Sequence, residues 1–122
     1  MNWTTILIVA VAVAVVFLLK KSGQISAQAA AAYLKNGALV IDVRSSGEFR
    51  TGHLPQAMNV PLDEIETAVP RRVRDKSQVL LLHCASGMRS GVAKGKLREM
   101  GYTNAFNLGS FGRAESILNR QK

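Results

Sequence analysis

The strongest constraint on the fold is an uninterrupted apolar run in the second half of the chain, residues 78–83 (QVLLLH). Apolar and polar residues do not alternate in it, which predicts a strand buried on both faces. Strands of this kind occur in parallel sheets that carry helices on both sides. Another apolar run with β-branched residues, 38–43, predicts a second buried strand that ends at Asp42.

Helical signals flank these strands. Ser26 is a good N-cap for a helix over residues 27–35, and Asn36-Gly37 suits its end. The other expected elements are a helical turn at 46–51, a brief extended segment between Pro55 and Pro61, helices at 62–69, 90–100 and 113–120, and a strand at 105–108. Pro70 is expected to interrupt or end the 62–69 helix. Strands alternating with helices predict an α/β domain with a central, mainly parallel sheet flanked by helices.

Length and composition narrow the classes of protein. A chain of 122 residues allows one domain and little else. Its single cysteine excludes an intramolecular disulfide and fits a reducing compartment. The net charge of +8 is compatible with anionic substrates, whereas few aromatics and no basic-aromatic stripe argue against a nucleic-acid partner. We expect a monomer.

The amino-terminal segment, residues 3–19 (WTTILIVAVAVAVVFLL), contains no charged residue. As a helix it would be roughly 25 Å long, slightly short of a ~30 Å hydrocarbon core, and snorkelling of Lys20 and Lys21 would cover the shortfall. It predicts a transmembrane helix, followed by a linker at 20–24. A buried strand is disfavoured by length, and a cleavable signal peptide by the lack of a basic residue before the apolar run.

The two lysines after this segment also predict an orientation. By the positive-inside rule the amino terminus lies outside and the remainder of the chain in the cytoplasm. We therefore expect a single-pass protein, bound to a membrane by its amino-terminal helix, in a bacterial inner membrane.

The segment with the clearest chemical signal is residues 80–90, LLLHCASGMRS. Cys84 falls at the carboxyl end of a predicted buried strand, the edge where open α/β sheets place ligand sites. A tight turn of backbone N–H groups before a helix binds anions, and Arg89 adds a positive charge; both should lower the pKa of Cys84. Taken by itself, a cysteine at the end of a strand is more often an inert core residue than a reactive one. Gly87 and Arg89 at these offsets favour a reactive site.

Two blocks of the sequence resemble the rhodanese family. Residues 38–61, ALVIDVRSSGEFRTGHLPQAMNVP, are similar to the family's early block with its Asp-Val-Arg, Glu-Phe and Gly-His-Ile-Pro-x-Ala elements. Residues 80–90 resemble the family's active-site loop. The likeness extends over nearly all of residues 24–122 and implies a rhodanese-like domain, which we place at 25–122.

The resemblance implies that Cys84 accepts a sulfane sulfur as a persulfide and passes it to a thiophilic acceptor. It also implies a cradle of backbone N–H groups for the outer sulfur, formed by Ala85, Ser86, Gly87, Met88 and Arg89. The implied donors are small anions (thiosulfate, polysulfide or a persulfide), and the acceptor is a thiol or cyanide. No cofactor is expected, and two histidines and one cysteine lack the spacing of metal ligands.

The loop differs in informative ways from related proteins. Four residues separate Cys84 from Arg89, as in rhodaneses, whereas the related dual-specificity phosphatases have five; this favours sulfur transfer over phosphatase or arsenate reductase activity. Many thiosulfate-using members carry basic residues where this chain has Ala85 and Ser86, so a persulfide or polysulfide donor is as plausible as thiosulfate. Residues 109–112 (GSFG) replace the family's paired glycines and Trp, with an expected effect on packing more than on chemistry.

Three other residues are supporting candidates. Asp42 is expected to accept backbone N–H groups or to pair with an arginine, and Arg44 and Arg50 are structural or reach an anionic substrate. His53 is expected to make a structural hydrogen bond, and strand alternation directs His83 away from Cys84. The leading function is a sulfurtransferase; the alternative is a non-catalytic rhodanese-like interaction module.

Overall fold

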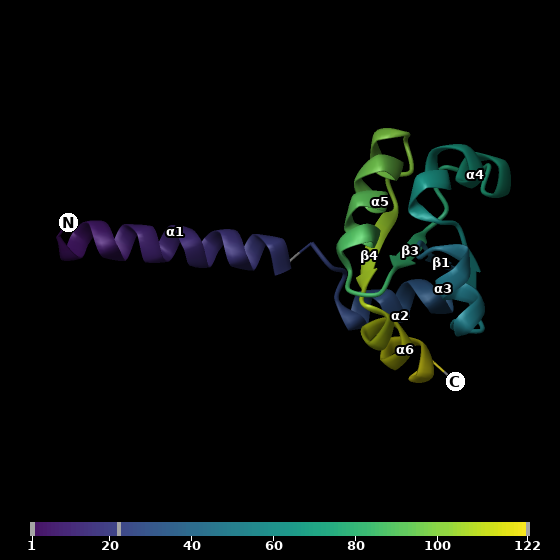
Figure 1. The fold of residues 1–122 in the computed structure, drawn as a ribbon, viewed down its shortest axis with the longest axis horizontal. Coiled ribbons are helices and arrows are strands. Elements are labelled where there is room, and N and C mark those ends of the chain that lie inside the picture. The colour runs from purple at the N-terminus through teal and green to yellow at the C-terminus, as the bar shows by residue number, and fades with distance from the viewer. Residues whose placement is uncertain (1, 22, 122) are drawn as a thin grey trace.

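The computed structural model describes residues 2–21 and 23–121, and Figure 1 shows their arrangement. The centre is a four-stranded sheet in the order β2-β1-β3-β4, and all of its strand pairs are parallel. The strands are β1 (Leu39–Asp42), β2 (Ala57–Asn59), β3 (Leu80–His83) and β4 (Ala105–Gly109). The predicted α/β architecture with a central parallel sheet is confirmed.

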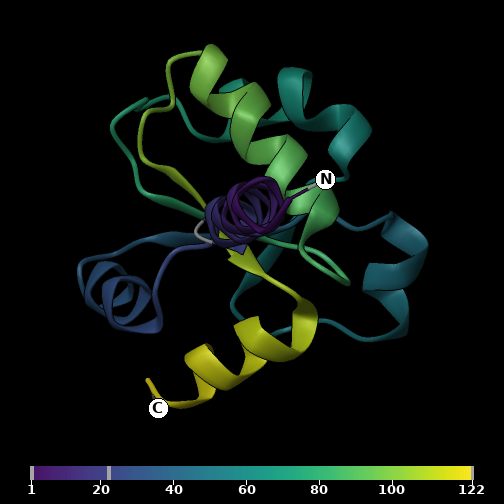
Figure 2. The same cartoon turned by 90° about the vertical axis from the view of Figure 1, so that its left-hand side faces the viewer.

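Helices cover both faces of this sheet (Figures 1 and 2). One face packs against α4 (Ile65–Arg72) and α5 (Met88–Glu99), the other against α2 (Ala27–Lys35) and α6 (Phe111–Asn119). Alternate residues of the central strand β3 serve the two cores: Leu80 and Leu82 lie on the α4–α5 side and Leu81 on the other. Double-sided burial explains why β3 lacks polar alternation in the sequence.

Side-chain caps determine where several helices begin. The Ser26 hydroxyl accepts the N–H of Ala29 at the start of α2, as predicted. The short helix α3 (Ser46–Thr51) begins with a capping box, in which Ser45 and Glu48 each accept the other's backbone N–H. This box holds the Glu48 carboxylate close to the end of β1.

The helix after residue 60 differs from the prediction. It starts as a 3₁₀ turn, η1 (Leu62–Glu64), and continues as α4 through Pro70 to Arg72. Proline removes one helical N–H donor, but Ile65 and Val69 on the same helix are fully buried in the core. Packing of this apolar face keeps the helix intact past the proline.

The amino-terminal helix α1 (Trp3–Lys21) requires a correction. Within residues 2–21 and 23–121, no helix combines the length and apolarity that crossing a bilayer requires. The predicted membrane localisation is therefore contradicted, and the predicted transmembrane helix at 3–19 and the membrane partner find no support in the described residues. The helix has 19 residues and ends in two lysines, which leaves an uncharged length of roughly 25 Å against a ~30 Å hydrocarbon core.

Candidate active site

Cys84 directly follows β3 and begins the loop that leads into α5. Gly87 lies in this loop with φ +97°, a left-handed conformation that favours glycine. The helix starts at Met88, two residues before the predicted start at Ser90. Met88 and Arg89 therefore belong to the first helical turn, whose N–H groups have no partner within the helix.

The Cys84 sulfur is surrounded by hydrogen-bond donors on its loop side. The Gly87 N–H donates to Sγ at 3.0 Å and the Ser90 N–H at 3.4 Å. The Ser90 hydroxyl oxygen lies 3.5 Å from Sγ. The side chain has 0% exposure and contacts the core beneath α5, so the sulfur has one apolar and one polar side.

The environment of Cys84 acts on its pKa in two directions. Burial raises the pKa of the thiol because it disfavours the charged form. Hydrogen bonds from the Ser90 side chain and from the N–H groups of Ser90, Gly87 and Ser86 lower it and outweigh burial. The net pKa lies below that of an ordinary cysteine, which raises the thiolate fraction near neutral pH.

The proposed cradle residues have different exposures. The side chains of Ala85, Ser86 and Met88 are exposed, Gly87 is buried and Arg89 is partly buried. The loop is tied to the segment after β4, since the Phe111 N–H donates to the Ala85 carbonyl at 3.3 Å. The rim of the loop thus faces solvent although the sulfur does not.

Arg89 is directed toward α3, where it pairs with the carboxylate of Glu48. Its Nη1 donates to Glu48 Oε1 at 2.7 Å and its Nη2 to Oε2 at 3.0 Å. Hydrogen bonds from Arg89, followed by those from Ser45, lower the pKa of Glu48 to about 2. The positive charge predicted to act on the cysteine is therefore largely compensated by Glu48.

Asp42 and Arg44 form a buried ion pair at the carboxyl end of β1. Arg44 donates to both Asp42 oxygens, with the shortest distance 2.8 Å, and its Nη2 also donates to the Gly52 carbonyl. The Arg44 backbone N–H donates to the same carboxylate at 2.9 Å. These contacts hold the polypeptide after β1 in place. Arg50, the third supporting candidate, is exposed on α3.

The two histidines occupy different environments. His53 Nδ1 lies 2.8 Å from the Phe49 carbonyl, and its ring stacks on Phe49 with 3.7 Å between centroids. His83 is fully buried and directed toward Phe111, on the sheet face opposite Cys84. Burial lowers the pKa of His83, which favours the neutral imidazole. In the described part of the chain, no three His, Cys, Asp or Glu side chains are grouped as a metal site.

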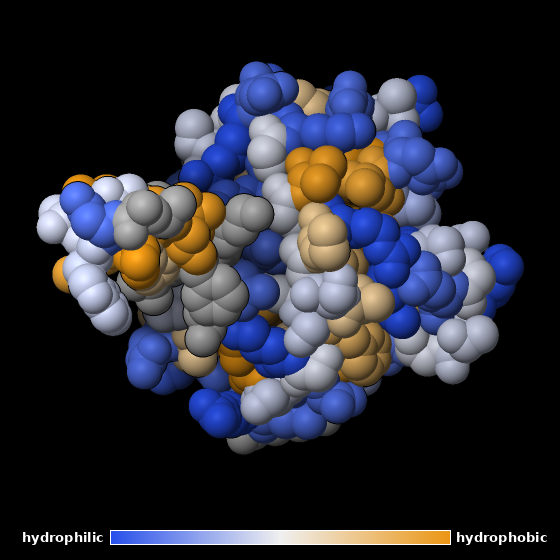
Figure 3. Space-filling view, turned by 60° about the vertical axis from the view of Figure 1, so that its left-hand side comes forward, coloured by the Kyte–Doolittle hydropathy of each residue, from blue (hydrophilic) through white to orange (hydrophobic). Residues whose placement is uncertain are grey.

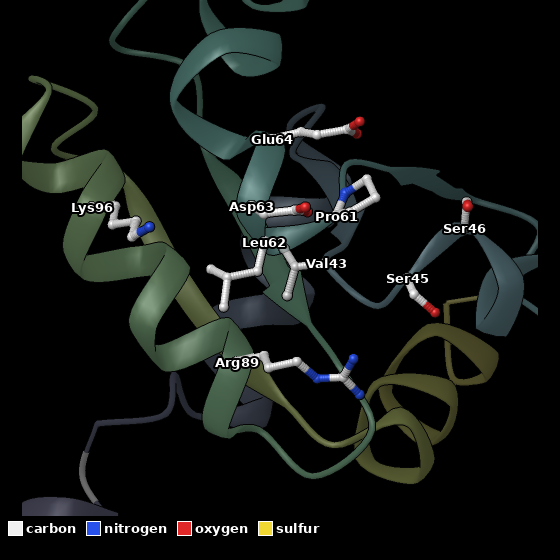
Figure 4. Close-up of a pocket in the computed structure, with 9 residues that line it drawn as sticks. All are labelled: Val43, Ser45, Ser46, Pro61, Leu62, Asp63, Glu64, Arg89 and Lys96. Atoms are coloured by element: carbon white, nitrogen blue, oxygen red, sulfur yellow. The ribbon is translucent and has the colours of Figure 1, made fainter.

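An open cleft of about 510 Å³ lies beside the loop (Figure 4). Arg89 of α5 extends across it toward Ser45 and Ser46, and Lys96 lies on the same helix further from the loop. Asp63 and Glu64 line the opposite side. Cys84 is not a lining residue, so its sulfur lies outside this cleft.

Three features of this site were missed by sequence reasoning: Glu48, Asn107, and the role of Ser90 as a hydrogen-bonding partner of the Cys84 sulfur. The Asn107 side chain of β4 accepts the Ser90 hydroxyl at 2.7 Å and donates to the Gly87 carbonyl at 3.1 Å. The six-residue spacing from Cys84 to Ser90 was a usable signal, since it places the hydroxyl in the first turn of the helix. The pairing of Glu48 with Arg89 and that of Asn107 with Ser90 gave no local signal, because the partners lie 41 and 17 positions apart in the sequence.

A parallel sheet with helices on both faces and a cysteine in the loop before one of those helices defines a class of α/β proteins. Comparison with known proteins identifies the family. The chain matches the rhodanese-like domain family over residues 18–111, and it belongs to that family. It is 39% identical over 69 residues to the thiosulfate sulfurtransferase PspE of Escherichia coli strain K12, which covers 57% of this chain and 66% of PspE. The chain thus spans just under two thirds of that relative.

Solved structures agree with this assignment. A structure described as rhodanese with anions from E. coli is 35% identical, with a TM-score of 0.61, and the match covers 63% of this chain and 91% of the other. The human single-domain sulfurtransferase TSTD1 is 28% identical, with a TM-score of 0.64, and the match covers 81% of this chain and 97% of TSTD1. The chain is therefore a member of a family that includes sulfurtransferases, with a single cysteine.

Proposed function

We propose that this protein is a sulfurtransferase that carries sulfane sulfur as a persulfide on Cys84. The observation that carries the proposal is the pair of backbone N–H groups, of Gly87 and Ser90, that donate to Cys84 Sγ. Donors placed around a sulfur favour its thiolate, and the thiolate is the nucleophile in sulfur exchange. Membership of the family and the similarity to PspE support this assignment.

In the first half-reaction the Cys84 thiolate attacks the outer sulfur of the donor. A bond forms between Sγ and that sulfur, and the bond to the rest of the donor breaks. The electron pair leaves with the donor remnant, as sulfite from thiosulfate or as a thiolate from a persulfide. The product is a Cys84 persulfide with a negative outer sulfur, and no external oxidant or reductant is required.

In the second half-reaction an acceptor thiolate or cyanide attacks the outer sulfur of the persulfide. The Sγ–S bond breaks, its electron pair returns to Sγ, and the starting thiolate is restored. Between the two steps the backbone N–H groups of residues 85–89 would bind the negative outer sulfur. The N–H groups of Met88 and Arg89 at the start of α5, which have no acceptor within the helix and lie at the positive end of its dipole, suit this role.

The charges around the loop bear on the donor. Ala85 and Ser86 are uncharged, and Arg89 is already paired with Glu48 at 2.7 Å. A dianion such as thiosulfate gains less from a compensated guanidinium than from a free one. The open cleft beside Arg89 offers space for a larger donor body. These features support a persulfide or polysulfide as a donor alongside thiosulfate.

The test is mass spectrometry of the intact protein after exposure to thiosulfate, polysulfide or glutathione persulfide in separate reactions. Because the chain has one cysteine, persulfidation adds a single sulfur of about 32 Da. The Cys84→Ser variant is the matched control and should gain nothing. Loss of the added mass on addition of a thiol or cyanide completes the cycle. No gain with any of the three donors would contradict the proposal and favour a non-catalytic interaction module.

A further inference from the structure

The side chain of Asn107 in β4 makes three hydrogen bonds, two of which connect the strand to the active-site loop and the start of α5. Its Nδ2 donates to the Gly87 carbonyl at 3.1 Å. Its Oδ1 accepts the Gly109 N–H at 2.9 Å and the Ser90 hydroxyl at 2.7 Å. The residue is buried, with 7% exposure. A buried amide with both of its ends engaged is held in one orientation.

The orientation of this amide follows from its partners. A carbonyl such as that of Gly87 requires a donor, and the Gly109 N–H requires an acceptor, so exchanging Oδ1 and Nδ2 would break both bonds. Gly91 of α5 leaves room for the amide, since a Cβ there would lie 3.3 Å from Asn107 Nδ2. The oxygen of the amide must therefore face Ser90.

Ser90 has one hydroxyl proton and two potential acceptors. Its Oγ lies 2.7 Å from Asn107 Oδ1 and 3.5 Å from Cys84 Sγ. Because Oδ1 cannot donate, the 2.7 Å contact requires the proton of Ser90. While that bond exists, the hydroxyl presents a lone pair to the sulfur and can only accept the S–H of the thiol. It can stabilise the thiolate only after turning away from Asn107.

We propose that Asn107 is a positioning residue for the Ser90 hydroxyl. Asn107 Oδ1 accepts the Ser90 O–H while Cys84 is a thiol, and the O–H turns to donate to the sulfur when the thiolate forms. The proposal deepens the sulfurtransferase assignment and rests on it for its biological role. After the hydroxyl turns, Asn107 Oδ1 still accepts the Gly109 N–H. Neither state leaves the amide oxygen unsatisfied, so turning the hydroxyl strands no buried acceptor.

Other charged groups near Cys84 are the same in both states. On α5, Arg89 is paired with Glu48 of α3. On the opposite face of the sheet, His83 of β3 lies 3.9 Å from Asp42 of β1. None of them takes part in the Ser90–Asn107 bond. Variants at positions 90 and 107 therefore change the hydrogen bonding of the sulfur and leave these charges in place.

The experiment is the pH dependence of alkylation of Cys84 by iodoacetamide. It compares the full chain with Ser90→Ala, Asn107→Ala and the double variant. We expect Ser90→Ala to raise the midpoint of the profile by about one pH unit, because a donor to the thiolate is lost. Asn107→Ala should lower the midpoint by roughly half a pH unit, because the Ser90 proton becomes free to face the sulfur.

The double variant separates positioning from a structural role. Loss of the bond to the Gly87 carbonyl occurs in both backgrounds, so an effect through the loop alone would appear equally in each. We expect Asn107→Ala to lower the midpoint only where Ser90 is present. A raised or unchanged midpoint in Asn107→Ala, or the same change with and without Ser90, would overturn the proposal.

A second measurement needs no change at Asn107 and covers the case in which that variant fails to fold. Below the thiol pKa, the infrared S–H stretch of the single cysteine should show a hydrogen-bonded thiol, and Ser90→Ala should move it toward the free value. An identical band in both proteins would contradict the inferred proton direction. Neither measurement involves a sulfur donor, so failure of the persulfide assay is a separate result.

Discussion

Arg89 and Glu48 are 41 positions apart in the sequence and form a two-bond ion pair beside the Cys84 loop, at 2.7 and 3.0 Å. Each side chain is 38% exposed, so the pair contributes little to stability but decides where the guanidinium points. The carboxylate also belongs to the capping box of α3 and cannot move freely. The charge available to an incoming anion is therefore set by an element other than the loop itself.

Glu48→Gln should raise kcat/KM for thiosulfate several-fold. Glutamine retains an oxygen for the Ser45 N–H but removes the charge that compensates Arg89, so a dianionic donor is attracted more strongly. The measurement is steady-state transfer to cyanide at low ionic strength. Since the pKa of Glu48 is about 2, the carboxylate becomes protonated only as the pH falls toward that value, and the effect should be constant from pH 5 to 8.

The control for this prediction is the same substitution in an Arg89→Ala background. If the gain comes from releasing Arg89, Glu48→Gln should have no effect there. An equal gain with and without Arg89 would show that the effect arises from the overall charge of the surface.

Gly87→Ala should raise the midpoint of the alkylation profile and destabilise the protein by about 1–2 kcal/mol. A side chain is strained at φ +97°, and its Cβ would lie 3.1 Å from Gln24 Nε2. The resulting shift moves the N–H that donates to Sγ at 3.0 Å. Because that bond favours the thiolate, weakening it moves the pKa of Cys84 upward toward its ordinary value.

Gly95→Ala is the matched control on the same loop-helix unit. A Cβ at Gly95 meets nothing within 4 Å, and the residue lies inside α5. It should leave the alkylation midpoint unchanged and stabilise the protein by about 0.5–1 kcal/mol, the usual gain from glycine to alanine in a helix. Urea unfolding measures both variants. Equal effects of the two substitutions would rule out a special role for Gly87.

Arg44→Ala should destabilise the protein by about 3–5 kcal/mol, because it leaves the buried Asp42 carboxylate without its partner. Arg50→Ala, an exposed arginine nearby in the sequence, should change stability by less than about 0.5 kcal/mol. The comparison is made by urea unfolding at pH 7. A loss below about 1 kcal/mol for Arg44→Ala would show that water or another donor replaces the guanidinium.

Local signals predicted much of the fold. The N-cap at Ser26 and the end of α2 at Lys35 agree with the prediction, since capping involves groups within a few residues of each other. Strand β3 was predicted because burial on both faces appears directly in composition. Continuation through Pro70 was missed, because its cause is the packing of Ile65 and Val69 against the sheet rather than the propensity of the proline.

The amino-terminal helix shows a different limit of sequence reasoning. Its apolar composition predicted a membrane span, and the helix itself is present. Its uncharged length is roughly one turn less than a bilayer core requires, a margin that the prediction had assigned to lysine snorkelling. Composition thus predicted the helix correctly and its environment wrongly.

The sequence alone determined the order of strands and helices, the cysteine after the buried strand and the glycine that allows the loop to turn, because each depends on residues close together in the chain. Only the tertiary structure decided that Glu48 forms an ion pair with Arg89 and that Asn107 accepts the hydrogen bond of the Ser90 hydroxyl. These contacts join α3 and β4 to the loop across the carboxyl edge of the sheet. Side chains on separate elements meet only when the sheet is assembled, so no local pattern records them.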